Sequence, residues 1–297
     1  MNLLSDEQKG TLYAISSGVC YGLIGYFGVS LMNSGLSVFN MLFWRYFVAT
    51  LFMLIILLPK YKMIFQEYKE SLKVLFYGMA LYSISTVFYF IASKYLGTGL
   101  SMVILFVFPA MVILLNIIFY KTKINKIYLF SFSILMIGMI CLADIQGVTV
   151  DILGIGFGLL AALFYAFYIF FSKRIIISPA FSTLMVSAGS MITCYIASYL
   201  DSSFYMPNSF NTWLNIFGIA LLCTVFPILL LLHGLKHIRS EKASMLSVLE
   251  PVFVVAFGIV LLDEKISNLQ LVGTMIILSG ALVIAVSSDN KIQQFSK

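Results

Sequence analysis

The sequence predicts an all-α integral membrane protein of ten transmembrane helices. Hydrophobic residues make up 61% of the chain and charged residues only 10%, far from the composition of soluble proteins. A helix needs about 20 apolar residues to cross the hydrocarbon core. Cut at its polar breaks, the chain gives ten apolar stretches, here called spans 1 to 10: 11–32, 38–58, 73–93, 98–120, 127–144, 152–172, 180–200, 213–233, 243–262 and 268–287.

Each span is expected to be a helix. Backbone groups in lipid must be hydrogen-bonded within the protein, which excludes open strands. Stretch 152–172 also lacks the alternation of a barrel strand. The residues before span 1 include Asp6 and Glu7 and form no basic region, so span 1 is expected to be retained rather than cleaved as a signal peptide.

The positive residues alternate along the chain with the spans. With the N-terminus in the cytoplasm, all but three of the 18 Lys and Arg fall in cytoplasmic segments, the exceptions being Arg45, Lys94 and Lys265. Cytoplasmic loops of membrane proteins are enriched in Lys and Arg, so we expect both termini to be cytoplasmic. The net charge of +6 then faces anionic lipid headgroups, and no nucleic-acid partner is expected.

The two halves of the chain resemble each other. Identities recur without a gap at the 142-position offset that separates Pro109 from Pro251, and Gly138 meets Gly280 at the same offset. We therefore expect two five-helix repeats, residues 1–145 and 146–297. Because five is odd, the second repeat has to lie inverted in the membrane. Inverted repeats are typical of secondary transporters.

The charges after the fourth span of each repeat agree with this inversion. Lys121-Thr122-Lys123 follows span 4 and is predicted to be cytoplasmic, whereas Asp263-Glu264-Lys265 follows span 9 and is predicted to lie outside. The same position of the repeat thus carries a different charge on each side of the membrane.

These features resemble the EamA-type ten-helix transporters of the drug/metabolite transporter superfamily. The resemblance covers the whole chain. It departs from the family at Lys121-Thr122, where family first repeats usually carry an acidic residue. It implies alternating access and the export or exchange of small metabolites, amino acids or drugs. The residues that carry it are Arg45 and Pro109 in the first half and Glu250-Pro251, Leu262-Asp263-Glu264-Lys265, Gly273 and Gly280 in the second.

Two charged residues lie inside spans, away from their ends. Glu250 is the acidic one, and a carboxylate at this depth is a candidate for function. It either contacts substrate or binds a proton or cation that is coupled to transport, or it bonds to an Arg, a His or freed backbone groups. Arg45 in span 2 either binds a substrate carboxylate or phosphate, or ties helices together through backbone carbonyls.

Pro109, Pro227 and Pro251 interrupt spans 4, 8 and 9. Each proline removes one helical hydrogen bond and frees the carbonyl four residues earlier. Breaks of this kind mark the binding site in transporters, and simple packing kinks are the alternative.

Residues with hydroxyl groups, five tyrosines and one serine, form a further group of candidates for binding substrate. Tyr82, Ser85 and Tyr89 are spaced to share one face of span 3. Tyr165 and Tyr168 share a face of span 6, and Tyr21 is the repeat equivalent of Tyr165. Buried hydroxyl groups need partners, so tyrosines in mid-span tend to face polar groups or a wet cavity.

Small residues and histidines have a less specific meaning. Gly18, Gly22 and Gly25 are spaced for close helix contact. His233 and His237 stand four residues apart, but no acidic ligand accompanies them. Neither a metal nor another cofactor is expected, and no sequence signature indicates an enzyme.

The sequence thus predicts a secondary transporter of the bacterial inner membrane. A small organic solute, an amino acid or related compound, is the expected cargo, with a proton or counter-solute as possible coupling partner. Metabolite uptake and drug efflux are the alternatives, and a polytopic membrane enzyme or a channel is a more distant one. The oligomeric state stays open.

Overall fold

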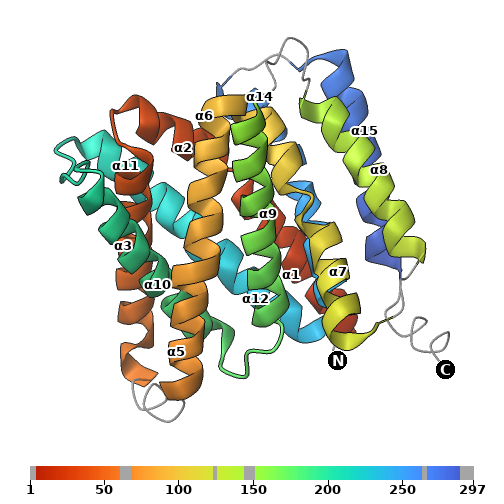
Figure 1. Ribbon diagram of the computed structural model, residues 1–297, viewed down its shortest axis with the longest axis horizontal. Helices are drawn as coiled ribbons and strands as arrows, with labels where there is room; N and C mark the ends of the chain where they lie inside the picture. The colour runs from red at the N-terminus through yellow and green to blue at the C-terminus, as the bar shows by residue number, and fades with distance from the viewer. Residues whose placement is uncertain (1–4, 61–67, 123–125, 144–150, 263–265, 288–297) are drawn as a thin grey trace.

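The protein is an all-helical bundle over the residues that its computed structural model describes, which are 5–60, 68–122, 126–143, 151–262 and 266–287. Ten helical segments in this part of the chain are long and apolar enough to cross a membrane. The prediction of ten helical spans is therefore confirmed. Figure 1 shows the helices running side by side, with α8 and α15 forming one flank of the bundle.

The first half of the chain provides spans 1 to 5. Span 1 is α1 (Asp6–Tyr21) and α2 (Ile24–Asn33). Span 2 is α3 (Val38–Leu57), which continues into the 3₁₀ turn η1 (Leu58–Lys60). Spans 3 and 4 are built from α5 (Tyr68–Tyr77), η2 (Gly78–Tyr82), α6 (Ser83–Leu105) and α7 (Phe108–Tyr120), and span 5 is α8 (Lys126–Ala143).

Spans 3 and 4 meet inside α6. The boundary is Gly97, whose φ of 74° lies in the left-handed region that glycine adopts without strain. Span 3 therefore runs over Lys69–Gly97 and span 4 over Gly99–Tyr120.

The second half provides spans 6 to 10. Spans 6 and 7 are α9 (Ile152–Ser172) and α10 (Pro179–Leu200). Span 8 consists of α11 (Phe210–Ala220), η3 (Leu221–Val225) and α12 (Phe226–His237). Span 9 consists of α13 (Ser240–Leu246), η4 (Ser247–Leu249) and α14 (Glu250–Leu262), and span 10 is α15 (Asn268–Val286).

Polar side chains fix where several helices begin. Ser5 and Gln8 form a reciprocal capping box at α1, and Ser267 and Gln270 form another at α15. Each such cap satisfies backbone N–H groups that the first turn leaves unpaired, and is worth about 1 kcal/mol. Because of its cap, α1 begins at Asp6, five residues before the apolar stretch that predicted it.

The helix interruptions lie directly before the prolines that predicted them. Pro109 and Pro227 stand in the first turn of α7 and α12, and Pro251 is the second residue of α14. A proline is tolerated in the first turn because the N–H it lacks has no helical partner there. Spans 4, 8 and 9 are therefore each interrupted near the middle of the span.

The interruption before Pro227 in span 8 is π-helical, and span 3 has a π-helical interruption as well. Each span contains a five-residue π-helical segment, η2 at Gly78–Tyr82 and η3 at Leu221–Val225. The two segments start 143 positions apart, within one residue of the offset between the halves. Single π turns occur frequently at functional sites.

The spans pack in pairs across the two halves. Span 3 packs against span 6 and span 8 against span 1, while span 2 pairs with span 7 and span 5 with span 10. If each span is replaced by its equivalent in the other half, the same set of pairs results. Glycines allow close approaches between helices: a Cβ at Gly138 would lie 3.0 Å from the Gly273 carbonyl oxygen, and one at Gly22 would lie 2.5 Å from Phe253 Cβ.

One end of the bundle is held by basic side chains, and we call it the basic end. Lys242 Nζ, in a side chain that is only 1% exposed, lies 2.7 Å from Glu7 Oε1 and 2.6 Å from the Ser287 carbonyl oxygen. Lys173 Nζ donates to the Ile238 carbonyl oxygen at 2.8 Å. The beginning of span 1, the start of span 9 and the ends of spans 6, 8 and 10 therefore share this end.

Candidate functional site

A cavity of about 60 Å³ lies inside the bundle, where spans 1, 2, 3, 4, 6 and 9 converge. The sequence predicted seven of its lining residues as substrate-binding, structural or coupling residues. An eighth predicted residue, Tyr168, stands behind the wall, with its ring 5.0 Å from that of Tyr82. The lining residues are Tyr21, Ile24, Arg45, Tyr82, Ser85, Thr86, Tyr89, Leu105, Phe106, Phe108, Tyr165, Ser247 and Glu250.

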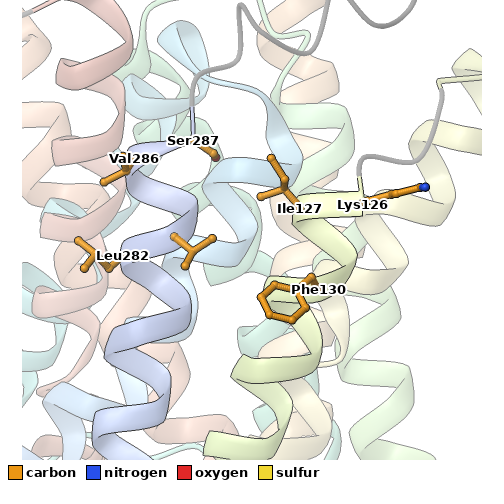
Figure 2. Close-up of a pocket in the computed structure, with 7 residues that line it drawn as sticks. Lys126, Ile127, Phe130, Leu282, Val286 and Ser287 are labelled. Carbon is orange, nitrogen blue, oxygen red and sulfur yellow. The ribbon is translucent and has the colours of Figure 1, made fainter.

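A larger cavity of about 620 Å³ opens on the outside of the bundle, between α8 and α15 (Figure 2). Apart from Lys126 and Ser287, its lining side chains are apolar, and Phe130, Leu282 and Val286 are exposed. Such a surface suits lipid rather than a polar solute, so we take the interior cavity as the candidate site.

Arg45 connects the cavity to span 8. Its guanidinium donates from Nε to Thr224 Oγ1 at 2.6 Å and from Nη2 to the Cys223 carbonyl oxygen at 2.7 Å. The Cys223 carbonyl has no α-helical donor, because the residue four positions later is Pro227, which lacks an N–H. Arg45 thus ties two helices together through a backbone carbonyl, as one of its two predicted roles requires.

The remaining nitrogen of Arg45 is not used in this contact. Nη1 is buried and has no hydrogen-bond partner among the described residues. The side chain as a whole is 1% exposed. Arginine carries five N–H groups in a fixed planar arrangement, so this guanidinium keeps donors available beside the cavity.

Glu250 is the acidic residue of the cavity. It begins α14, directly after the 3₁₀ segment η4 and before Pro251. Within the part of the chain that the structure describes, its carboxylate is in no ion pair and no hydrogen bond. Glu250 and Arg45 therefore place an ionisable acid and a basic side chain on one cavity, where electrostatic interactions are screened less than in bulk water.

Tyrosines form one wall of the cavity. The hydroxyl oxygens of Tyr21 and Tyr82 lie 3.0 Å apart in a buried hydrogen bond. The Tyr82 ring lies 6.2 Å from that of Tyr165, which in turn packs edge-on against Phe108 at 4.7 Å. The predicted face of span 3 and the predicted face of span 6 thus meet each other.

Ser85 and Tyr89 also line the cavity. Ser85 forms a hydrogen bond within the protein, and Tyr89 packs against an aromatic neighbour. Ser85 Oγ donates to the Ala161 carbonyl oxygen at 2.8 Å, which joins span 3 to span 6. Tyr89 packs against Phe90, with ring centroids 5.4 Å apart. The three prolines are not among the residues that line the cavity.

Several lining residues were not predicted. Thr86 belongs to the same helical face as Tyr82 and Tyr89, and this spacing could have identified it. Phe106 and Phe108 lie at the break in span 4, so the position of Pro109 could have identified them as lining residues. No local signal marks Thr224 and Cys223 as partners of Arg45, because that contact depends on which helices face each other.

The two histidines lie away from the cavity, at the end of span 8. Their rings stand 5.5 Å (His233) and 6.3 Å (His237) from the ring of Tyr13. His233 Nδ1 also lies 2.8 Å from the Leu229 carbonyl oxygen. Both side chains thus pack spans 1 and 8 together at the basic end.

Comparison with known proteins identifies relatives along the whole chain. A Bacillus subtilis (strain 168) protein, "Uncharacterized transporter YxxF", is 25% identical over 97% of this chain and 94% of its own length. An Archaeoglobus fulgidus "Uncharacterized transporter" is 24% identical over 69% of this chain and 74% of its own. The names of both relatives indicate a transporter.

Structure and family comparisons agree with these relatives. A solved structure, titled "Crystal structure of protein", matches with a TM-score of 0.77 and 14% identity over 97% of this chain and 99% of that one, and supports the fold. The model of the EamA-like transporter family matches twice, at residues 8–143 and 152–286. The chain, a multi-pass membrane protein with ten apolar helical segments in its described residues, therefore belongs to the EamA-like transporter family.

Proposed function

We propose that the chain is a secondary transporter that moves a small organic metabolite, an amino acid or related compound, by alternating access. The observation that carries this proposal is the interior cavity with Arg45 and Glu250 on its wall. Charged side chains at this depth are costly unless they face a polar occupant or each other. Export or exchange is the direction that we propose, with uptake and drug efflux as outcomes of the test.

The internal symmetry of the bundle supports alternating access. Spans pair across the halves in a set that survives exchange of the halves, and π segments occur at matching positions of spans 3 and 8. We infer that the two halves are inverted repeats. Such repeats can exchange conformations and so open a central site to either side in turn.

The basic end supports the orientation that we propose, with both termini in the cytoplasm. Lys173, Arg174, Lys236 and Lys242 belong to the basic end, as do Glu7 at the start of span 1 and Ser287 at the end of span 10. Cytoplasmic ends of membrane proteins are rich in such residues. The Bacillus relative is consistent with a bacterial cell membrane, and we propose the inner membrane where a cell has two.

Counterflow in proteoliposomes tests the proposal. Vesicles loaded with an unlabelled solute are diluted into the same labelled solute, and a panel of amino acids and nucleoside-like metabolites is screened with and without a proton gradient. A carrier gives saturable, transient accumulation of label that depends on the internal solute. Flux that neither saturates nor responds to internal solute would contradict the carrier mechanism and indicate a channel.

Protein-free vesicles are the control for leakage, and Gly156→Ala is the control for reconstitution. A Cβ added at Gly156 would meet nothing within 4 Å, so this variant should transport like the wild type. A response of the accumulation to the proton gradient would identify a proton as the coupling ion.

A further inference from the structure

The flank formed by α8 and α15 is closely packed at its glycines and opens toward the basic end. A Cβ at Gly273 would lie 2.7 Å from the Gly138 carbonyl oxygen, and one at Gly280 would lie 3.1 Å from Ile134 Cγ2. Between these contacts and the basic end, neither helix has a further glycine. There the pair borders the outer cavity of about 620 Å³, which we call the outer groove.

The outer groove is apolar along its length and polar at one end. Its apolar lining consists of Ile127, Phe130, Leu282, Val283 and Val286. Figure 2 shows Lys126 and Ser287 together at one end of the groove, with Phe130 and Leu282 further along it. At 1.5 Å per residue, positions 126 to 130 cover about 6 Å, which matches the part of a lipid acyl chain next to its headgroup.

Exposed apolar side chains alone do not distinguish this groove from the rest of the lipid-facing surface, because many spans expose them. The groove differs from them in being concave, with a volume in the range of about 300 to 1,000 Å³ that is typical of small-molecule sites. It also differs in having a cation at its end. A bound lipid is therefore expected to be held here more firmly than elsewhere on the surface.

Lys126 is available to bind an anion. It is the first residue of α8, its side chain is exposed, and it is in no ion pair with the described residues. Lys242, which bonds to the Ser287 carbonyl, is only 1% exposed and already pairs with Glu7. In Figure 2 the Lys126 side chain points away from α15, and rotation about its flexible stem brings the ammonium group over the groove.

A second copy of the chain suits the groove less well than a lipid does. Symmetric docking through this face would place two Lys126 side chains in one interface, and the described lining contains no acidic residue that could compensate them. A phospholipid offers an acyl chain to the apolar part and a phosphate to the lysine. Basic pockets between transmembrane helices bind anionic headgroups in this way.

We propose that the outer groove binds one anionic phospholipid, with an acyl chain along Phe130 and Leu282 and its phosphate at Lys126. The lipid belongs to the leaflet at the basic end. A zwitterionic lipid such as phosphatidylcholine also has a phosphate, but Lys126 repels its choline group. The groove is separate from the interior cavity, so this inference does not depend on the cargo.

Native mass spectrometry of the detergent-purified wild-type protein tests the inference. The protein is mixed with equal amounts of phosphatidylglycerol and phosphatidylcholine that carry the same acyl chains, and the bound lipids are counted. One lysine near an anionic headgroup changes the affinity by about fivefold. One phosphatidylglycerol should therefore be retained about fivefold more strongly than phosphatidylcholine, and equal retention would contradict the proposal.

Two variants locate the lipid, and a third is the matched control. Lys126→Gln should abolish the preference for phosphatidylglycerol. Leu282→Trp fills the groove and should weaken the retention of both lipids at least threefold, while the fold tolerates it because Leu282 is 64% exposed. Lys69→Gln is the control, since Lys69 is an exposed lysine at the start of α5 that is also in no ion pair with the described residues, and it should keep the preference.

Three results would overturn the inference. The first is an unchanged preference in Lys126→Gln, or a preference that Lys69→Gln loses as well. The second is competition by glycerol phosphate at the concentration of the lipid, which would show a site for phosphate alone. The third is a dimer that excludes the lipid, which would assign the groove to a second copy. Counterflow is unaffected by these results and judges the carrier proposal separately.

Discussion

Two contacts in this molecule solve the same structural problem with different chemistry. Span 2 of the first half supports the π segment of span 8 through Arg45, and span 7 of the second half supports the π segment of span 3 through Ser190 and Thr193. We call them the Arg45 contact and the Ser190 contact. Only the Arg45 contact leaves a buried donor unused among these groups.

The close approach of the helices at the Ser190 contact suits its short side chains. At the Ser190 contact a Cβ on Gly78 would lie 2.3 Å from the Val186 carbonyl oxygen, and one on Gly189 would lie 2.1 Å from that of Leu75. This close approach lets short hydroxyl side chains reach the neighbouring backbone. At the Arg45 contact a longer side chain makes the bonds to the neighbouring helix, and the same side chain lines the cavity. The comparison separates a contact that only packs from one that also borders the site.

The largest effect is expected from adding a methyl group at the Ser190 contact, where spans 3 and 7 already touch. Gly189→Ala places a methyl group 2.1 Å from the Leu75 carbonyl oxygen, which forces spans 3 and 7 apart and should destabilise the protein by about 3 kcal/mol. We expect loss of monodisperse protein in size-exclusion chromatography. Gly156→Ala, in open space, is the control. Normal stability of Gly189→Ala would show that the helices separate easily.

The next largest effect is expected at the Arg45 contact. Arg45→Met removes both bonds to span 8 and leaves the buried Cys223 carbonyl without its donor, at a cost of about 2 kcal/mol. Thermal unfolding in detergent measures the loss, and counterflow should fall to background for every solute. Transport that survives in folded Arg45→Met protein would restrict Arg45 to the structural role.

A smaller effect is expected from Ser190→Ala. This change deletes one neutral hydrogen bond to the Gly78 carbonyl and should lower stability by about 1 kcal/mol. Counterflow should stay within about twofold of the wild type, because Ser190 does not line the cavity. A transport loss as large as that of Arg45→Met would mean that the two contacts are functionally equivalent.

The smallest change in stability is expected from Pro227→Ala. The new N–H can compete with Arg45 for the Cys223 carbonyl, while the unfolded chain gains conformational freedom. We expect stability to change by less than about 1 kcal/mol and transport to fall, because Arg45 would be held less firmly. Unchanged transport would show that the position of Arg45 is set by Thr224 alone.

Much of this architecture could be predicted from the sequence because its signals are local. Span lengths follow from hydropathy, and the breaks in spans 4, 8 and 9 follow from prolines. Tyr82, Ser85 and Tyr89 could be assigned to one face from helical spacing. The predicted cavity residues come together because the faces of several helices point to the same interior.

What could not be predicted depends on contacts between distant segments. The π segment of span 3 has no proline, and it lies where Gly78 lets span 7 approach closely. The break between α1 and α2, at Gly22–Leu23 in span 1, lies where Phe253 of span 9 packs closely against the helix. Two alternative roles were predicted for Arg45, and only the fold shows that its helix contact uses Nε and Nη2; the substrate role stays a prediction.

The burial of Lys242 has a consequence for how the basic end can change. One ammonium group holds Glu7 of span 1 and the Ser287 carbonyl of span 10 from its own position in span 9. Losing one of these acceptors while the lysine stays buried would be unfavourable. We therefore expect the three helix ends to separate together rather than one at a time.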